Sequence, residues 1–282
     1  GDSAKSMLFL RNYAMERFLE RLSASKYRNC FILKGGMLIS AMVGIDSRAT
    51  MDIDTTLRNY PLNCESAEQI VRQIADVEID DKISFVIKKT EEIMEDSEYQ
   101  GVRLSLDAYL DKTRIPLKID ISTGDVITPC EISFSYQLMF ENRTIPLLAY
   151  PPETVLAEKL ETILSRGEAN TLLRDFYDVY ILQREDFVVT PDALCHALLA
   201  TCRKRGHEDL LHTYASILDR VRQSDTMRTQ WMKYQSDFDY AAGITWDTVL
   251  DTVETLCMKT LDDHAFGDEL PQEESQFEMH LL

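Results

Sequence analysis

The apolar positions in the first 150 residues follow two periods, one typical of helices and one typical of strands. Residues 7–22 carry Leu, Tyr and Phe close to every 3.6 positions with charged residues between them, which predicts an amphipathic helix. Asn63 is a favoured helix N-cap, and apolar positions at helical spacing follow it. Short apolar runs between the helices predict strands. The helices expected here are 7–22, 37–43 and 63–74, and the strands are 30–33, 51–57, 82–89, 102–110, 114–121 and 145–148.

After residue 150 the helical period continues almost without interruption. Pro151 and Pro152 mark the change, since proline is favoured in the first turn of a helix. We therefore predict an α+β protein, with a mixed-sheet domain over residues 1–150 followed by an all-helical domain over residues 151–282. The helices expected in the second half are 154–165, 171–183, 191–204, 208–223, 225–240 and 246–261.

The chain has 282 residues and a formal net charge of -18, and its acid excess is partly local. From Asp262 to the end there are seven acidic residues and no Lys or Arg, so a solvated acidic tail is expected. An acidic total argues against broad, sequence-independent binding of duplex nucleic acid, which needs many Lys or Arg contacts with phosphates. It leaves open an RNA end that reaches a local basic cleft, and a basic partner protein.

Cysteine usage and hydropathy indicate a cytoplasmic protein without a membrane span. The six cysteines form no Cys-x-x-Cys pair and have no histidine at zinc spacing, so reduced thiols are expected. No apolar run approaches the roughly 20 residues of a membrane helix, and no signal peptide is recognisable. The chain begins at Gly1 without a methionine, and a trimmed or replaced natural N-terminus is expected.

The first chemical candidate is an acidic pair that follows a diglycine. An apolar run leads into Gly35 and Gly36, and a later strand pattern contains Asp52 and Asp54. Side chains two apart on a strand share a face, so these carboxylates would repel each other unless a cation lies between them. Mg²⁺ suits such a pair, and a glycine turn at a helix N-terminus offers N–H groups to phosphate. A metal–nucleotide site is favoured over a solvated strand edge, because burying unpaired charge in an apolar strand is costly.

A third acid lies within another apolar strand. Asp120 follows Lys118 by two residues, so both side chains share one face of that strand. If this strand neighbours Asp52 and Asp54, three carboxylates meet, which is the arrangement that two-metal phosphoryl transfer requires. The third carboxylate would help to hold one metal and would receive the proton of the attacking hydroxyl. The alternative is a surface pair between Lys118 and Asp120, which contributes little.

A second polar cluster lies in the helical half. Asp175 and Asp178 share a helix face, and Lys159 is a candidate to meet a triphosphate as a point charge. Asp178 would orient Lys159 or the substrate hydroxyl. The alternative is a helix surface, with Lys159 among solvated glutamates and Arg174 paired with Asp178 one turn away; spacing alone favours it. Neither a P-loop nor a Gly-x-Ser-x-Gly motif is present, which argues against P-loop NTPases and serine hydrolases.

Five short motifs stand in a specific order between residues 7 and 185. They are Lys34-Gly-Gly36, Arg48-Ala-Thr-Met-Asp-Ile-Asp54, Lys118-Ile-Asp120, Leu156-Ala-Glu-Lys159 and Arg174-Asp-Phe-Tyr-Asp178. Together they make the chain resemble the AbiEii/AbiGii-type nucleotidyltransferase toxins, which are the toxin halves of bacterial toxin–antitoxin and abortive-infection systems. In that family a nucleotidyltransferase-fold domain is followed by a helical domain, which agrees with the division predicted above.

The resemblance implies a role for each motif. The residues implied to bind the nucleotide are Lys34, Gly35, Gly36 and Lys118. The residues implied to act in catalysis are Asp52, Asp54, Asp120, Lys159 and Asp178, and the first three of these would hold the metal. Lys159 would bind phosphate, and Asp178 would complete a cleft between the two halves. Many nucleotidyltransferases have Gly-Ser in place of Gly35-Gly36, so one hydroxyl contact with phosphate is missing in this chain.

The sequence and the resemblance together predict a Mg²⁺-dependent nucleotidyltransferase, the toxin of a toxin–antitoxin or abortive-infection system. It would transfer a nucleoside monophosphate from an NTP to a hydroxyl of RNA, such as a tRNA end, or of a protein. A cognate antitoxin would be a partner. Two alternatives stay open: a nucleotidyltransferase that modifies a small hydroxylated molecule such as an aminoglycoside, and a non-catalytic nucleotide-binding module.

Overall fold

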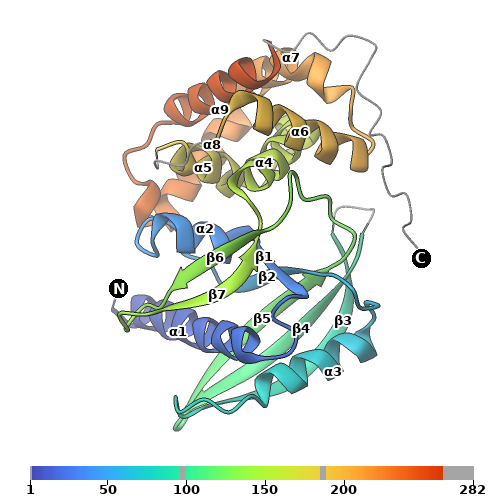
Figure 1. The fold of residues 1–282 in the computed structure, drawn as a ribbon. Helices are drawn as coiled ribbons and strands as arrows, with labels where there is room; N and C mark the ends of the chain where they lie inside the picture. Colours follow the sequence, from blue (N-terminus) through green and yellow to red (C-terminus); the bar gives the residue numbers. More distant parts are fainter. Residues whose placement is uncertain (1, 96–98, 185–188, 263–282) are drawn as a thin grey trace, which may run out of the picture.

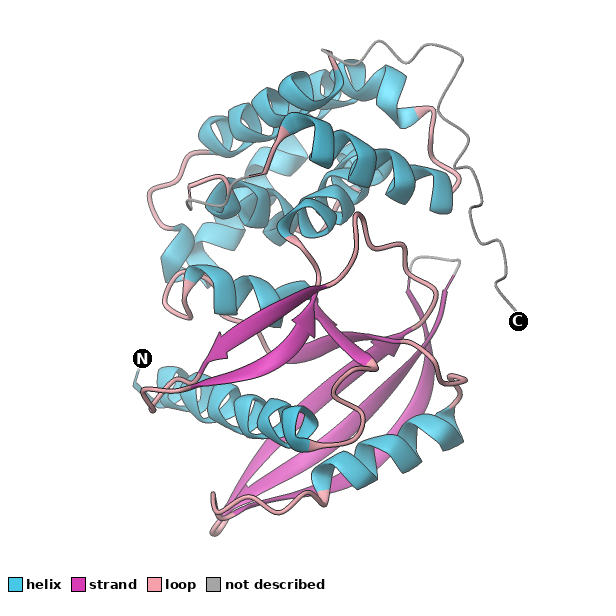
Figure 2. Cartoon of the chain, viewed as in Figure 1, coloured by secondary structure: helices cyan, strands magenta, loops and turns pink. Residues whose placement is uncertain are grey.

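The computed structural model has two parts, a sheet with three helices and a bundle of helices stacked on it (Figure 1). The structure describes residues 2–95, 99–184 and 189–262. The last strand ends at Ala149 and the first helix of the bundle begins at Pro152, as Figure 2 shows by the change from strands to helices. The predicted α+β class, with a mixed sheet and a C-terminal helical region, is therefore confirmed. The division into two domains at residue 150 stays a prediction.

The bounds of the elements are as follows. The strands are β1 (Phe31–Lys34), β2 (Asp52–Leu57), β3 (Ile83–Glu95), β4 (Tyr99–Leu110), β5 (Thr113–Ser122), β6 (Ile132–Gln137) and β7 (Thr144–Ala149). The helices of the first part are α1 (Asp2–Ala24), α2 (Gly35–Val43) and α3 (Cys64–Ala75). The α-helices of the second part are α4 (Pro152–Arg166), α5 (Leu173–Leu182), α6 (Pro191–Lys204), α7 (Leu210–Gln223), α8 (Asp225–Asp237) and α9 (Trp246–Leu261).

The seven strands form one mixed sheet in the order β3-β4-β5-β2-β1-β7-β6. Strand β2 pairs in parallel with β5 and antiparallel with β1, so it lies at the centre. Because of this register Asp54 lies directly opposite Asp120 on one side and Lys34 on the other. Three segments that are far apart in the sequence thus bring their polar side chains to the middle of the sheet.

The two faces of the sheet differ in character. In β5 the side chains of Ile115, Leu117, Ile119 and Ile121 are buried, and α1 and α3 cover this face (Figure 1). The alternate residues of β5 face the other way, as expected for a period of two. Helix α2 lies on that second side, between the sheet and the helical bundle (Figure 1). The apolar alternation thereby directs the charged residues toward the bundle.

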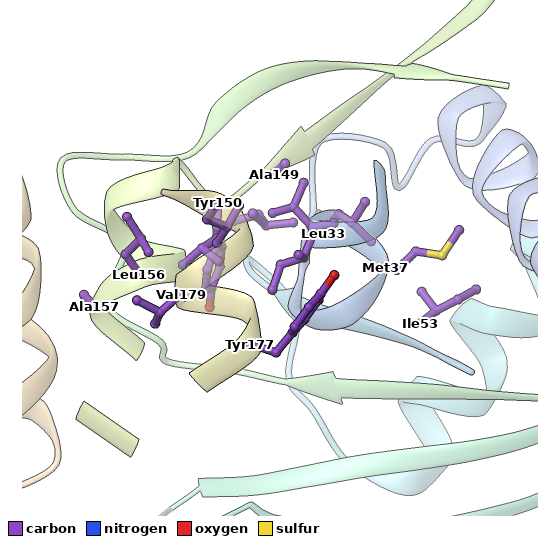
Figure 3. Close-up of a cluster of buried hydrophobic side chains, with 14 of the residues drawn as sticks. Leu33, Met37, Ile53, Ala149, Tyr150, Leu156, Ala157, Tyr177 and Val179 are labelled. Atoms are coloured by element: carbon purple, nitrogen blue, oxygen red, sulfur yellow. The ribbon is translucent and has the colours of Figure 1, made fainter. Parts of the chain in front are cut away.

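A continuous core joins the two parts of the molecule. Figure 3 shows Leu33 and Met37 of the first part in one cluster of buried side chains with Tyr150, Tyr177 and Val179. The Tyr177 hydroxyl also donates a hydrogen bond of 2.6 Å to the backbone carbonyl of Ser47. The helical bundle is therefore packed directly onto α2 and the loop that follows it.

Several predicted bounds needed correction. The β3–β4 hairpin is longer than the two expected strands, and the helix expected at 225–240 ends at Asp237. Strand β6 was missed; it lies at the edge of the sheet, pairs only with β7 and buries few side chains. All six cysteines fall within the described residues, and none of them forms a disulfide there. The acidic tail lies outside the described residues beyond Asp262. No helix in the described part of the chain is long and apolar enough to span a membrane.

Candidate active site

Three carboxylates form the floor of the site on adjacent strands. Asp52 and Asp54 project from the same face of β2, and Asp120 lies directly beside Asp54 on β5. Burial raises the pKa of Asp52 and of Asp54, and the nearby charge of Asp120 raises both further. Both directions mean that ionised carboxylates are less favourable here than in water, because the site is buried and contains a neighbouring negative charge.

Arg103 of β4 is bound to the third carboxylate. Its Nε and one terminal nitrogen donate hydrogen bonds of 2.7 and 2.6 Å to the two oxygens of Asp120. These bonds are the main reason why the pKa of Arg103 is raised. The sequence analysis missed Arg103, because it reaches Asp120 only through the register between β4 and β5. Asp120 therefore pairs with Arg103, and not with Lys118 as in the alternative reading of the sequence.

The diglycine lies against the acidic pair at the start of α2. Gly35 has a φ of +60°, and a Cβ built there would lie 2.7 Å from Cγ of Asp54. The backbone N–H of Gly36 donates a hydrogen bond of 3.3 Å to the Asp54 carboxylate. Glycine is required at position 35 both for its positive φ and for this close approach. The first N–H groups of α2 therefore open toward the space above the carboxylates.

Many nucleotidyltransferases have a serine where this chain has Gly36. In this structure the hydroxyl of Thr50 lies close to that position. A Cβ built on Gly36 would lie 2.6 Å from Oγ1 of Thr50, so that hydroxyl occupies the space of a side chain at position 36. Thr50 comes from the loop before β2 and lines the same cavity as the diglycine. The sequence analysis did not single out Thr50.

Lys34 is held by a buried carboxylate, Asp125. Its Nζ lies 2.9 Å from Oδ2 of Asp125, which also accepts hydrogen bonds of 2.7 Å from the hydroxyls of Ser122 and Tyr150. Burial opposes ionisation of Asp125, but Lys34 and the hydroxyl donors outweigh it and hold the pKa of Asp125 well below its usual range. Asp125 lies in the loop after β5, and the sequence analysis did not single it out. It fixes the ammonium group next to Gly35.

Lys159 of α4 forms part of a buried ion cluster. Its Nζ lies 2.5 Å from Oδ1 of Asp175 and 3.2 Å from Oδ2 of Asp178. Burial opposes the charge on Lys159, but these two carboxylates outweigh it and raise the pKa of Lys159. The Lys159 side chain is 18% exposed and reaches the cavity.

Asp178 lies behind that lysine and not at the surface. Its side chain is 0% exposed, and it accepts hydrogen bonds of 2.6 and 3.2 Å from Arg48. Burial opposes its ionisation, but Arg48 and Lys159 outweigh it and lower the pKa of Asp178. The surface alternative, in which Arg174 pairs with Asp178, is therefore wrong. The structure places Asp178 as a support for Lys159 and Arg48.

A cavity of about 740 Å³ lies between the sheet and the bundle. This volume falls within the range of small-ligand pockets. Among the predicted site residues, those that line it are Lys34, Gly35, Gly36, Asp52, Asp54, Asp120 and Lys159. Lys118 and Asp178 are absent from the lining. The sequence thus predicted most of the sheet wall of the cavity.

The opposite wall comes from the helical bundle and contains residues that sequence analysis missed. Glu161 of α4 is 1% exposed and is bonded to Arg205 and, at 2.6 Å, to Nδ1 of His207. Arg166 and Arg174 also line this wall. Arg174 begins one of the five motifs but was not predicted to line the cavity, and no motif distinguishes the others, because they converge only when α4, α5 and the segment after α6 pack together.

The chemistry of the carboxylates fits a hard divalent cation. Asp52, Asp54 and Asp120 offer only oxygen donors, which suits Mg²⁺, and their mutual repulsion would be relieved by positive charge. However, among the described residues no group of three or more carboxylate, imidazole or thiol side chains is already arranged to hold an ion. Both oxygens of Asp120 are bonded to Arg103, so a guanidinium group already occupies the third carboxylate of the set.

Comparison with solved structures gives distant likenesses. One is the "putative nucleotidyltransferase from H. pylori", 14% identical, with a TM-score of 0.48 over 91% of this chain and 97% of that one. A second is JHP933 from Helicobacter pylori, 14% identical, with a TM-score of 0.47 over 91% and 94%. A third is an antigenic nucleotidyltransferase-like protein from Paracoccidioides brasiliensis, 13% identical, with a TM-score of 0.40 over 71% and 90%.

Comparison with protein families is decisive. No curated protein matches the chain. The family model described as "Nucleotidyl transferase AbiEii toxin, Type IV TA system" matches residues 17–252, which is well over half of the chain and includes the five motifs. The resemblance predicted from the sequence is confirmed: the chain belongs to the AbiEii nucleotidyl transferase toxin family of type IV toxin–antitoxin systems.

Proposed function

We propose that this protein is a metal-dependent nucleotidyltransferase that acts as a toxin. The proposal is carried by one observation: a row of three carboxylates lies against the glycine-rich N-terminus of α2, and Lys159 lines the same cavity. Carboxylates, backbone N–H groups at a helix N-terminus and a fixed cation are the groups that phosphoryl transfer needs for positioning and charge neutralisation.

In the proposed reaction an acceptor hydroxyl attacks the α-phosphorus of an NTP. A new P–O bond forms, the bond from the α-phosphorus to the bridging oxygen of pyrophosphate breaks, and pyrophosphate leaves. Asp52 and Asp54, with Asp120, would hold Mg²⁺. When bound, the ion would neutralise charge on the phosphates and lower the pKa of the attacking hydroxyl.

The residues of the chain contribute binding, orientation and proton transfer. The N–H groups at Gly35 and Gly36 bind the phosphate oxygens, because the N-terminus of α2 favours anions. Lys159, oriented by Asp175 and Asp178, neutralises the phosphates from the helical side. Asp120, once it is free of Arg103, accepts the proton of the attacking hydroxyl.

The favoured acceptor is the end of an RNA molecule. Arg103, Arg166, Arg174 and Arg205 line the cavity, although the protein as a whole is strongly acidic. This local basic lining suits one phosphate-bearing strand and does not suit a long duplex. An aminoglycoside acceptor is the second candidate, because Glu158 also lines the cavity and its carboxylate suits a cationic amine.

The test is transfer of label from an α-³²P-labelled NTP with Mg²⁺. Total RNA and a panel of aminoglycosides are offered as separate acceptors to wild type and to Asp52→Asn/Asp54→Asn. We expect label on RNA with wild type and a loss of at least about a hundredfold in the double variant. Equal transfer by both proteins contradicts the proposal, and label on the aminoglycosides alone contradicts the RNA acceptor.

The toxin role has its own measurement. Induction in a bacterial host is expected to arrest growth with wild type and to leave growth normal with Asp52→Asn/Asp54→Asn. Co-expression of the cognate antitoxin should restore growth. Arrest by both proteins would show that toxicity does not depend on the carboxylates.

A further inference from the structure

Arg103 and a divalent cation require the same side chain. The guanidinium group makes a two-bond pair with Asp120, so both carboxylate oxygens already accept a strong hydrogen bond. An ion that uses Asp120 as a ligand needs one of these oxygens. The ion and the guanidinium group therefore compete for one carboxylate, because each cation reduces the negative charge that Asp120 offers to the other.

The register of the sheet gives Arg103 a second partner. Glu91 of β3, Arg103 of β4, Asp120 of β5 and Asp54 of β2 lie directly opposite one another in one row across four strands. Glu91 is 39% exposed, and its Oε2 accepts a hydrogen bond of 2.5 Å from Lys89. The guanidinium thus has a carboxylate on each side, one in the site and one at its edge.

Arg103 also has room to move. Its side chain is 33% exposed and lines the cavity, whereas the Asp120 side chain is 8% exposed. A nucleotide bound in the same cavity would bring phosphate oxygens, which are good acceptors for a guanidinium group. The Asp120 carboxylate has much less freedom, so the arginine is the member of the pair that leaves.

We propose that Arg103 is a positioning residue that competes with the divalent cation for Asp120 until substrate draws the guanidinium group away. The inference rests on the proposed function, because it concerns the cation of that reaction. It assigns to Arg103 control over metal affinity: without the arginine, the acidic row binds the ion more tightly in the absence of nucleotide. An arginine that instead presented Asp120 to the metal would have the opposite effect.

The experiment is a Mn²⁺ titration, followed by the EPR signal of the free ion, without nucleotide. Arg103→Gln is expected to bind Mn²⁺ about three- to tenfold more tightly than wild type, because a partly exposed ion pair no longer competes. Arg103→Lys keeps the charge and loses the two-bond geometry, so an intermediate affinity is expected. Thermal unfolding of each variant verifies that the fold is retained.

The matched control is Lys118→Gln. Lys118 is exposed, lies on β5 directly opposite Asp52 and shares the face of Asp120, so its loss removes the same charge without removing a bond to Asp120. A similar gain in Mn²⁺ affinity in Arg103→Gln and Lys118→Gln would show that the loss of one positive charge explains the effect. That result would overturn the proposal. Weaker binding by Arg103→Gln would also overturn it.

A double-mutant cycle isolates the pair itself. In an Asp120→Asn background, Arg103→Gln is expected to leave Mn²⁺ affinity unchanged, because the competition no longer exists. A gain that persists in this background contradicts the proposal. Absence of Mn²⁺ binding in every protein, wild type included, would instead contradict the metal site on which the proposed function depends.

Discussion

At the scale of single residues, two carboxylates near the site have opposite effects on stability. Asp125 is buried but fully compensated by Lys34 and by hydroxyl donors, whereas Asp54 is close to other acids and has a raised pKa. The first stabilises the fold in its ionised form. The second is retained although its charge destabilises the fold, which is typical of functional sites.

Asp125→Asn is expected to lower the free energy of unfolding by about 3 kcal/mol, because it leaves the Lys34 ammonium without its buried counter-charge. The pKa of Asp125 is depressed in the folded state, so its contribution is present above the ordinary aspartate pKa of about 4 and is lost as pH falls below it. Urea unfolding at neutral and acidic pH measures both effects.

The control for that change is Asp80→Asn, at an exposed aspartate in a loop. It should alter stability by less than about 0.5 kcal/mol. An equal loss in both variants would mean that the network around Asp125 contributes nothing specific. A wild-type acid dependence that persists in Asp125→Asn would contradict the assignment of that dependence to this carboxylate.

Asp54→Asn is expected to have the opposite sign and to raise the free energy of unfolding by about 1 kcal/mol near neutral pH. The amide removes repulsion with Asp52 and Asp120 and keeps an acceptor for the N–H of Gly36. The same variant should have lost nucleotidyl transfer. Urea unfolding and the transfer assay are measured on one preparation, and destabilisation would contradict the account of Asp54.

Side-chain partners could be predicted from the sequence only where a local period determines them. The period of two placed Asp52 and Asp54 on one face, and the apolar strand around Asp120 indicated a third acid. Arg103 and Asp125 were missed, because strand register and turn geometry decide their partners and neither is encoded in spacing.

At the scale of elements, the two ends of α2 have different requirements. Gly35 begins the helix with a positive φ and lies against Asp54, while Gly44 caps its other end with a φ of +90° and open space around it. Position 35 therefore combines a conformational demand with a steric one. Position 44 has only the conformational demand.

Gly35→Ala is expected to abolish transfer and to destabilise the protein by about 2 kcal/mol, since the methyl group would displace the Asp54 carboxylate. Gly44→Ala is the matched control, with a cost of about 1 kcal/mol and retained activity. The measurement compares the nucleotidyl-transfer rates of the two variants at equal concentrations of folded protein. Similar activity in the two variants would contradict a specific role for the close approach.

Element types were predicted well where the pattern was long. The helices of the second half and the strands β4 and β5 have strong periods and match the structure. Strand β6 was missed because a half-exposed edge strand has weak apolar alternation and little burial to enforce it. The ends of α7 and α8 differ from the predicted bounds by a few residues, which helix ends commonly do.

At the scale of the whole molecule, a buried ion pair connects the sheet part to the bundle. Arg48 lies in the loop before β2, and its partner Asp178 lies on α5; their side chains are 4% and 0% exposed. The resemblance indicated a cleft between the two parts. The pairing that holds its walls together was beyond prediction, because it depends on how the bundle docks.

Arg48→Met is expected to lower the free energy of unfolding by about 3–5 kcal/mol, because Asp178 remains buried with one cation fewer. The exposed pair of Arg228 and Asp247 provides the control, and Arg228→Met should cost less than about 1 kcal/mol. Denaturant unfolding compares the two variants. Equal small losses would contradict a stabilising contact between the parts.

The central claim is that the site around Asp52, Asp54 and Asp120 transfers a nucleoside monophosphate and releases pyrophosphate. The most direct measurement offers the same NTP labelled with ³²P either at the α- or at the γ-phosphate, with Mg²⁺ and RNA, to wild type and to Asp52→Asn/Asp54→Asn. We predict that wild type attaches the α-label to RNA and releases the γ-label as pyrophosphate, and that the double variant does neither. Attachment of the γ-label, or equal attachment of the α-label by both proteins, would contradict the claim.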